Sequence, residues 1–153
     1  MKIHIIDGYN AIHSLQSLSR FLLKEEGLKL AREDLVRKCA EKFKSSFIVV
    51  FDGKLGRKGT DTPNTIFTSE GVSADEVILD LVSQYRSKNF IVYVYTRDRS
   101  LQEKAKQRGA ISMDPNEICR EIRKSSKNFE NFETKSKKLR YYNWEKEFGI
   151  TQD

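Results

Sequence analysis

The chain has 153 residues, about the size of a single domain, and is 38% hydrophobic and 33% charged with only 8 Gly and 2 Pro. This composition excludes the disordered and Gly/Pro-rich classes of protein. Two cysteines and two histidines exclude a disulfide framework and an ordinary structural zinc site. Because no run approaches the ~18 apolar residues of a membrane helix, we expect a cytoplasmic protein with no membrane partner.

Apolar and β-branched runs alternate with helical patterns along the chain. In chain order, strands are predicted at residues 3–6, 47–51, 65–68, 90–95 and 110–113, of which the third and fifth are the weakest. Apolar residues at helical spacing predict helices within residues 28–43, where Cys39 would be a core residue, and 77–85. A further helix at 99–108 ends at Gly109, and another opens at Asp114-Pro115.

This order of elements predicts the fold class. Strands without polar alternation, separated by helices, are typical of βαβ units and of a parallel sheet covered on both faces. Right-handed crossovers then give a doubly wound α/β domain, which we place at residues 1–124. Residues 125–153 would form a basic, aromatic C-terminal extension. Its aromatic residues would dock on the domain, form a partner surface or stack on bases, and we favour docking.

The positive charge is concentrated in this C-terminal part of the chain. The whole chain carries a net charge of +6, and residues 123–142 contain seven basic and two acidic residues, a net charge of +5. A polyanion is a natural partner for such a segment, because neutralised phosphates release their counterions. A solvated basic tail without a partner explains the composition equally well.

Carboxylates follow the predicted strands. They lie after three of the strands and in the first turn of one helix: Asp7, Asp52, Asp98, Asp75 and Glu76. Ligands of an open parallel sheet bind beyond the carboxyl ends of its strands, at the point where the strand order reverses. We therefore expect these side chains to converge if the strand that ends before Asp7 is central.

Each of these residues also has a purely structural explanation. Residues 73–76 form a capping-box pattern, Asp98 is placed to cap the helix that follows it, and Asp52 with its neighbouring glycine fits an ordinary turn. Asp114 fits the capping interpretation so fully that we assign it no chemistry.

The electrostatics of the whole set favours a bound cation. At ~5 Å and an effective dielectric constant of ~20, two carboxylates repel each other by about 3 kcal/mol, so four or five together need a cation among them. Oxygen ligands without converging thiolates select Mg²⁺ or Mn²⁺ over zinc. Acidic ligands in a basic protein suit a phosphodiester substrate, because lysines and arginines can hold the rest of the strand.

Four sequence blocks resemble a known family. They are Ile5-Ile6-Asp7-Gly8-Tyr9-Asn10, Val49-Val50-Phe51-Asp52-Gly53, residues 67–76 and residues 96–102. Their order and spacing, over about residues 2–117, resemble the YacP-like branch of the NYN domains in the PIN-like nuclease superfamily. The C-terminal extension lies outside this resemblance.

The resemblance implies a PIN-like parallel sheet and a metal-dependent endoribonuclease that cleaves messenger RNA in the context of translation, with single-stranded RNA and the ribosome as partners. It implies Asp7, Asp75 and Asp98 as the main metal-site carboxylates. Asn10 would orient Asp7 or a bound water. Glu76 and Asp52 would line the same site as residues of second rank.

Metal-assisted attack of water on phosphorus would leave 5′-phosphate and 3′-hydroxyl ends. The alternative route through the 2′-hydroxyl needs a pair of histidines. His4 is predicted within a buried strand and His13 on the first helix, with no sign that they meet, so we interpret both as structural residues.

Six basic residues are candidates for RNA contacts: Lys54, Arg57, Lys58, Arg97, Arg99 and Arg32. The first three lie in a glycine-rich loop that would overhang the site, although a solvated surface loop is the alternative. Arg97 stands where related proteins often have a small residue. It would either contact a substrate phosphate or neutralise an aspartate and weaken metal binding.

A non-catalytic RNA- or ribosome-binding module is the main alternative, with the carboxylates acting only as caps and turns. A receiver-like signalling domain would share the architecture, but it needs a pair of acids after the first strand and a lysine after the last, which this chain lacks. The glycine-rich loop also lacks the Gly-Lys-Ser/Thr ending of a P-loop, so nucleotide hydrolysis is not expected.

Overall fold

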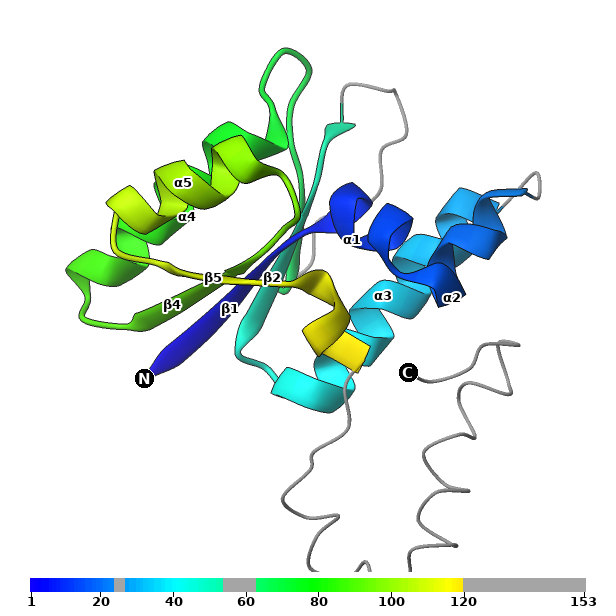
Figure 1. Ribbon diagram of the computed structural model, residues 1–153, viewed down its shortest axis with the longest axis horizontal. Coiled ribbons are helices and arrows are strands. Elements are labelled where there is room, and N and C mark those ends of the chain that lie inside the picture. The colour runs from blue at the N-terminus through cyan, green and yellow to red at the C-terminus, as the bar shows by residue number, and fades with distance from the viewer. Residues whose placement is uncertain (24–26, 54–62, 120–153) are drawn as a thin grey trace, which may run out of the picture. The chain divides into compact units, whose positions relative to one another are not determined.

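A computed structural model describes residues 1–23, 27–53 and 63–119, which build a five-stranded parallel sheet with helices on both faces (Figure 1). The strands are β1 (Lys2–Asp7), β2 (Phe47–Phe51), β3 (Thr65–Phe67), β4 (Ile91–Tyr95) and β5 (Ile111–Met113). All five strands expected from the sequence are present, so the predicted fold class is confirmed. The proposed boundary at residue 124 and the extension 125–153 lie outside the described residues.

The strand order is β3-β2-β1-β4-β5, and all four neighbouring pairs are parallel. The chain therefore builds β2 and β3 on one side of β1, then crosses back to build β4 and β5 on the other side. The order reverses between β1 and β4, so the switch point lies beside the carboxyl end of β1. The condition for convergence of the carboxylates, a central first strand, is fulfilled.

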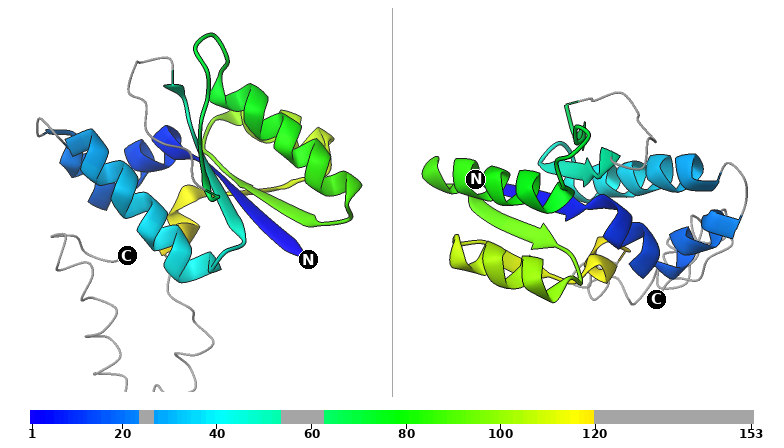
Figure 2. Two further views of the ribbon diagram at one scale, coloured as in Figure 1. Left: turned by 180° about the vertical axis from the view of Figure 1, so that it is seen from behind. Right: turned by 90° about the horizontal axis from the view of Figure 1, so that it is seen from above.

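Right-handed crossovers decide which helices cover which face. One face carries α1 (Gly8–Ser14), α2 (Gln16–Ser19), the 3-10 helix η1 (Arg20–Leu23) and α3 (Gly27–Phe43) (Figures 1 and 2). The other face carries α4 (Ala74–Ser87) and α5 (Arg99–Gln107). Among the described residues, no helix is long and apolar enough to cross a membrane.

The helix predictions are confirmed within a residue or a few at each end. Cys39 is fully buried on α3, as expected. Gly109 follows the end of α5 with φ +97°, a conformation that favours glycine. The segment that opens at Asp114 is a 3-10 helix, η3 (Pro115–Cys119), rather than the start of a regular α-helix. Asp114 does cap it, because its Oδ1 accepts a hydrogen bond from the amide of Asn116 at 2.8 Å.

Alternate residues of the strands face the two helical layers. Ile3 and Ile5 of β1 belong to the buried cluster that α4 and α5 share with β2 and β4. His4, between them, stacks instead on Phe43 of α3, with ring centroids 4.0 Å apart. Asp7 continues the row of Ile3 and Ile5, so the alternation directs its side chain toward the layer of α4 and α5.

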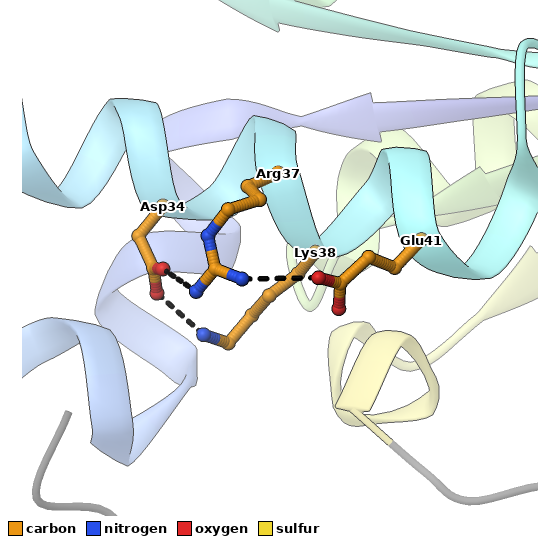
Figure 3. A network of polar contacts seen from close by, with 4 residues as sticks. All are labelled: Asp34, Arg37, Lys38 and Glu41. Atoms are coloured by element: carbon orange, nitrogen blue, oxygen red, sulfur yellow. Dashed lines mark hydrogen bonds and ion pairs between the residues drawn. The ribbon is translucent and has the colours of Figure 1, made fainter. Parts of the chain in front are cut away.

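A buried ion pair links two successive turns of α3 (Figure 3). Asp34 and Lys38 are only 6% and 4% exposed, and Lys38 Nζ donates to Asp34 Oδ2 one helical turn away. Arg37 Nη2 contacts the other oxygen of Asp34 at 2.7 Å, and Arg37 Nη1 contacts Glu41 at 3.0 Å. Pairing of this kind is what makes a buried charge tolerable, so we interpret the network as structural.

Candidate active site

Asp7 is the last residue of the central strand and stands at the switch point. Its Oδ2 accepts a hydrogen bond from Thr96 Oγ1 at 3.0 Å. Burial is the main reason that the pKa of Asp7 rises from 3.8 to about 6; the bond from Thr96 opposes the rise, and the negative charges of Asp75, Asp98 and Asp52 add to it. Asp7 therefore lies within the electric field of three other carboxylates.

Asp75 and Glu76 lie in the first turn of α4, whose N-cap is Ser73. Ser73 Oγ accepts a hydrogen bond from the Glu76 amide at 3.2 Å, which confirms the predicted cap. Burial raises the pKa of Asp75, and the charge of Asp98 adds to the rise, while Lys104 of α5 opposes it. Asp75 thus belongs to the same group of charges as Asp7, whereas Glu76 is exposed.

Asp98 is the N-cap of α5, as its structural explanation required. Its Oδ1 accepts from the amides of Ser100 at 2.9 Å and Leu101 at 3.3 Å. Both capping bonds use Oδ1, and no described residue donates to Oδ2. Capping of the helix and binding of a cation therefore need different oxygens of Asp98 and are compatible.

Thr96 joins the two sides of the site, a role that the sequence did not predict. It is fully buried, and its Oγ1 accepts a hydrogen bond from the Asp98 amide at 3.1 Å while it donates to Asp7. Its carbonyl accepts from Gln102 Nε2 at 2.8 Å. A hydroxyl residue two positions before a helix cap is typical of a side-chain turn, which was the available sequence signal.

Asn10 makes a hydrogen bond that the sequence did not predict. Its Oδ1 accepts a hydrogen bond from the backbone amide of Arg97 at 2.8 Å, so it anchors the loop between β4 and α5 to α1. The Arg97 side chain lies 3.4 Å from Asp114 Oδ1, and the two side chains are 45% and 52% exposed. Within the described part of the chain, Arg97 forms no ion pair with a site carboxylate.

Two glycines let the backbone approach closely around Asp7 and Asp52. A Cβ on Gly8 would lie 2.4 Å from the ring of Phe51, so α1 can begin directly after Asp7 only because this residue is glycine. A Cβ on Gly53 would lie 2.2 Å from the carbonyl oxygen of Thr68. The Gly53 amide also donates to Thr68 Oγ1 at 2.9 Å, which fixes the backbone immediately after Asp52.

The carboxylates share one edge of the sheet without forming a complete set of direct metal ligands. Within residues 1–23, 27–53 and 63–119, no three Asp, Glu, His or Cys side chains lie close enough together to hold one ion. The described carboxylates are therefore not gathered as three direct ligands of one ion, and one oxygen of Asp7 and one of Asp98 already accept hydrogen bonds from Thr96 and from the Ser100 amide. Mg²⁺ commonly retains several waters and takes one or two carboxylates, so this set of oxygen donors fits a hydrated divalent ion.

The structure describes only some of the basic residues that the sequence offers for RNA contacts. Three of them lie outside the described residues: Lys54, Arg57 and Lys58. Arg99 is exposed in the first turn of α5. Arg32 of α3 is partly buried, and its Nη1 lies 3.4 Å from the hydroxyl of Tyr9.

The histidines lie apart from the carboxylates. His4 Nδ1 is 2.9 Å from Tyr95 Oη, and burial, with Lys2 and Lys42, lowers the pKa of His4 to about 4. His13 is exposed on α1. A hollow at the amino edge of the sheet, opposite Asp7, has His4 in its wall and is lined also by Lys2, Lys42, Phe43, Tyr85 and Phe90. The structural interpretation of His4 agrees with these contacts.

The model of the YacP-like NYN domain family matches residues 4–149. This chain belongs to that family. Two solved structures are similar to it. A mutant form of Rae1 (YacP) from Bacillus subtilis has 30% sequence identity over 84% of this chain and 79% of its own, with a TM-score of 0.67. Rae1 (YacP) from Bacillus subtilis has 29% identity over 97% of this chain and 86% of its own, with a TM-score of 0.65. No curated protein matches.

Membership of the YacP-like NYN family confirms the resemblance drawn from the four sequence blocks. It assigns the chain to the PIN-like nuclease superfamily and supports a nuclease-type function in RNA processing. One expectation is corrected, because the family match runs to residue 149 and so includes most of the C-terminal extension that we had left outside the resemblance.

Proposed function

We propose that this YacP-like protein is a divalent-metal-dependent endoribonuclease that hydrolyses single-stranded RNA, with messenger RNA at the ribosome as its setting. The observation that carries the proposal is the environment of Asp7. This carboxyl group stands at the switch point of the sheet, with its pKa raised to about 6 by burial and by three neighbouring carboxylates. Such an environment favours a cation, and the family relationship makes RNA the fitting substrate.

Asp7, Asp75 and Asp98 would hold Mg²⁺ or Mn²⁺, with Asp52 and Glu76 at the margin of the site. When bound, the ion supplies positive charge at the scissile phosphate and lowers the pKa of water, and in-line hydrolysis leaves 5′-phosphate and 3′-hydroxyl ends. The described lysines and arginines form no ion pair with Asp7, Asp75, Asp98 or Glu76. The negative charge of these four carboxylates is therefore available to a metal ion.

The supporting residues have positioning roles in this proposal. Thr96 fixes the orientation of the Asp7 carboxylate, and Asn10 holds the backbone next to Asp98. The six basic residues that the sequence offers as candidates would contact the phosphates of the strand: Arg32, Arg97, Arg99, Lys54, Arg57 and Lys58.

A second candidate, a non-catalytic RNA- or ribosome-binding module, is favoured by one specific observation. Asp98 is a fully formed helix cap, and the described carboxylates are not gathered into direct ligands of one ion. In this case the protein binds RNA and leaves it intact.

The two candidates are separated by incubating the full chain with single-stranded RNA in EDTA, Mg²⁺ or Mn²⁺ and mapping the ends of the products. We expect metal-dependent cleavage with 5′-phosphate and 3′-hydroxyl ends, and its loss in Asp7→Asn. Asp80→Asn is the matched control, because Asp80 is exposed on α4 and takes no part in the site. Binding without cleavage in either metal would favour the module, and cleavage that persists in EDTA would contradict both metal dependence and the assignment of Asp7.

A further inference from the structure

A guanidinium group and two aromatic rings meet at the carboxyl edge of the sheet. Tyr9 lies in the first turn of α1, two residues after Asp7, while Arg32 comes from α3 and Phe67 ends β3. Arg32 Nη1 is 3.4 Å from the Tyr9 hydroxyl, and Arg32 Cζ lies over the Phe67 ring, 5.5 Å from its centroid. Three segments distant in the chain thus place planar groups side by side.

A buried ring holds this group in position. Phe51, only 1% exposed, has its centroid 5.0 Å from that of Tyr9 and 5.2 Å from that of Phe67. The missing side chain of Gly8 lets α1 begin against the same Phe51 ring. Tyr9 and Phe67 are therefore both packed on one core residue, and Arg32 is oriented by both of them.

The charge of Arg32 has no carboxylate partner in the part of the chain that the structure describes. The ion pairs there use Arg37, Lys38 and Arg97 instead. One long hydrogen bond to Tyr9 uses one of the five N–H groups of a guanidinium. A partly buried cation that lacks a counter-charge is suited to an anionic ligand, and a guanidinium also offers a flat face for stacking.

We propose that Tyr9 and Arg32, with Phe67 packed against Arg32, form a subsite for one unpaired nucleotide of an RNA strand, whose base stacks on the Arg32 guanidinium and the Tyr9 ring. The inference rests on the proposed function, since it places this nucleotide beside the phosphate held at Asp7. Stacking needs a base with an open face, and RNA recognition by aromatic rings and guanidinium planes uses unstacked, single-stranded bases. The subsite would therefore select single-stranded over double-stranded RNA and tolerate any base.

The test measures binding of the full chain to a fluorescent single-stranded oligoribonucleotide in EDTA, where metal-dependent cleavage cannot occur. The oligonucleotides are just long enough to occupy the site in one register, and each member of the series lacks one base, at successive positions. We expect removal of one particular base to weaken binding by roughly 5- to 150-fold, the range for one stacked base, and the other removals to have little effect. A matched RNA duplex should bind more weakly than the single strand.

Three variants assign this effect to the subsite. Arg32→Lys keeps the charge but loses the plane, Tyr9→Leu loses the ring, and both should bind all oligonucleotides of the series alike. Tyr9→Phe keeps the ring and should retain the dependence on that one base. Arg108→Lys is the matched control, because Arg108 follows α5 and its guanidinium is bonded to Leu79 O and Ser83 Oγ. The thermal unfolding temperature of each variant shows that it is folded.

Three results would overturn the subsite: equal effects at every position, an unchanged dependence in Arg32→Lys, or equal binding of duplex and single strand. The subsite and the nuclease can also fail separately. A wild-type protein that shows the position-dependent binding but cleaves no RNA in Mn²⁺ retains the subsite and loses the nuclease. A wild-type protein that cleaves RNA normally but shows no position-dependent binding retains the nuclease and loses the subsite.

Discussion

Asp7 destabilises the folded protein at neutral pH. Its pKa rises from 3.8 to about 6 on folding, so the folded state holds the proton more tightly than the unfolded state. Protonated Asp7 is tolerated in the folded state, so its favourable effect on the free energy of unfolding is fully present below about pH 4. This effect is lost as the pH rises through about 6 and the buried carboxyl group becomes charged. A rise of this size corresponds to a destabilisation of about 2–3 kcal/mol at neutral pH.

We predict that Asp7→Asn increases the free energy of unfolding by about 2 kcal/mol at neutral pH, because asparagine removes the buried charge and can still accept the bond from Thr96. Urea unfolding between pH 4 and 8 measures the difference between variant and wild type, which should vanish toward the acid end. Asp80→Asn, on the exposed face of α4, should change little. A variant less stable than wild type at neutral pH would contradict this account of Asp7.

The Thr96 hydroxyl donates to Asp7 and accepts from the Asp98 amide. A valine has the same shape but can make neither hydrogen bond. We predict that Thr96→Val weakens Mn²⁺ binding about 10- to 100-fold, the usual effect of losing a group that orients a metal ligand. Because the Thr96 hydroxyl lowers the pKa of Asp7, the variant should also show a higher pKa at that residue. Calorimetric titration measures the metal affinity, and Thr96→Ser, which restores the hydroxyl, should recover most of it.

For single residues, the sequence predicts the place in the fold better than the hydrogen-bond partners. Asp7 and Asp98 were placed at the carboxyl edge because each follows an apolar run. The bond between Asp7 and Thr96 spans 89 residues, and the bond between Asn10 and Arg97 spans 87, so no local pattern contains them. The sequence predicts that Asn10 orients Asp7 or a bound water, and it contains no sign of the hydrogen bond that Asn10 accepts from the Arg97 amide.

Among the elements, the junction between β1 and α1 depends most on a single residue. We predict that Gly8→Ala lowers the free energy of unfolding by about 1–3 kcal/mol, the usual range for overpacking a core. The new methyl group would meet the Phe51 ring at 2.4 Å and the Val50 carbonyl oxygen at 2.9 Å. His13→Ala, exposed on the same helix, is the control and should stay within about 0.5 kcal/mol of wild type. Equal unfolding midpoints for both variants in urea would refute the close approach.

Most of the elements were predictable because their apolar patterns are local. Even the two weakest strands were found, as β3 and β5, whereas the short helices α2 and η1 were not predicted. At η3 the sequence predicted a helix but not its type, since Asp114 satisfies both nearby donors: its side chain accepts from Asn116 and its carbonyl oxygen accepts from the Glu117 amide at 2.9 Å. A capping pattern identifies where a helical turn begins, but not whether it continues as an α-helix.

For the whole molecule, a bound ion should relieve the repulsion among the carboxylates. We predict that Mn²⁺ at about 100 times its dissociation constant stabilises the fold by about 2.7 kcal/mol, which for a chain of this length raises the unfolding temperature by roughly 5–10 °C. Thermal unfolding with and without Mn²⁺ measures the shift. Asp7→Asn should show little of it, and an equal shift in both proteins would place the ion elsewhere.

The strand order is a feature of the whole molecule that the sequence did not predict. Convergence of the carboxylates required a central first strand, and local patterns do not say which strands are neighbours. The return of the chain from β3 past β2 and β1 to β4 provides that arrangement. Membership of the YacP-like family was readable from motifs alone, although its extent toward the C-terminus was not.

The two outermost strands, β3 and β5, span only three residues each. A short edge offers few unpaired backbone groups on which another polypeptide could add a strand, so it discourages amyloid-like and sheet-extending association. At high protein concentration, these short edge strands would help neighbouring copies remain separate instead of polymerising.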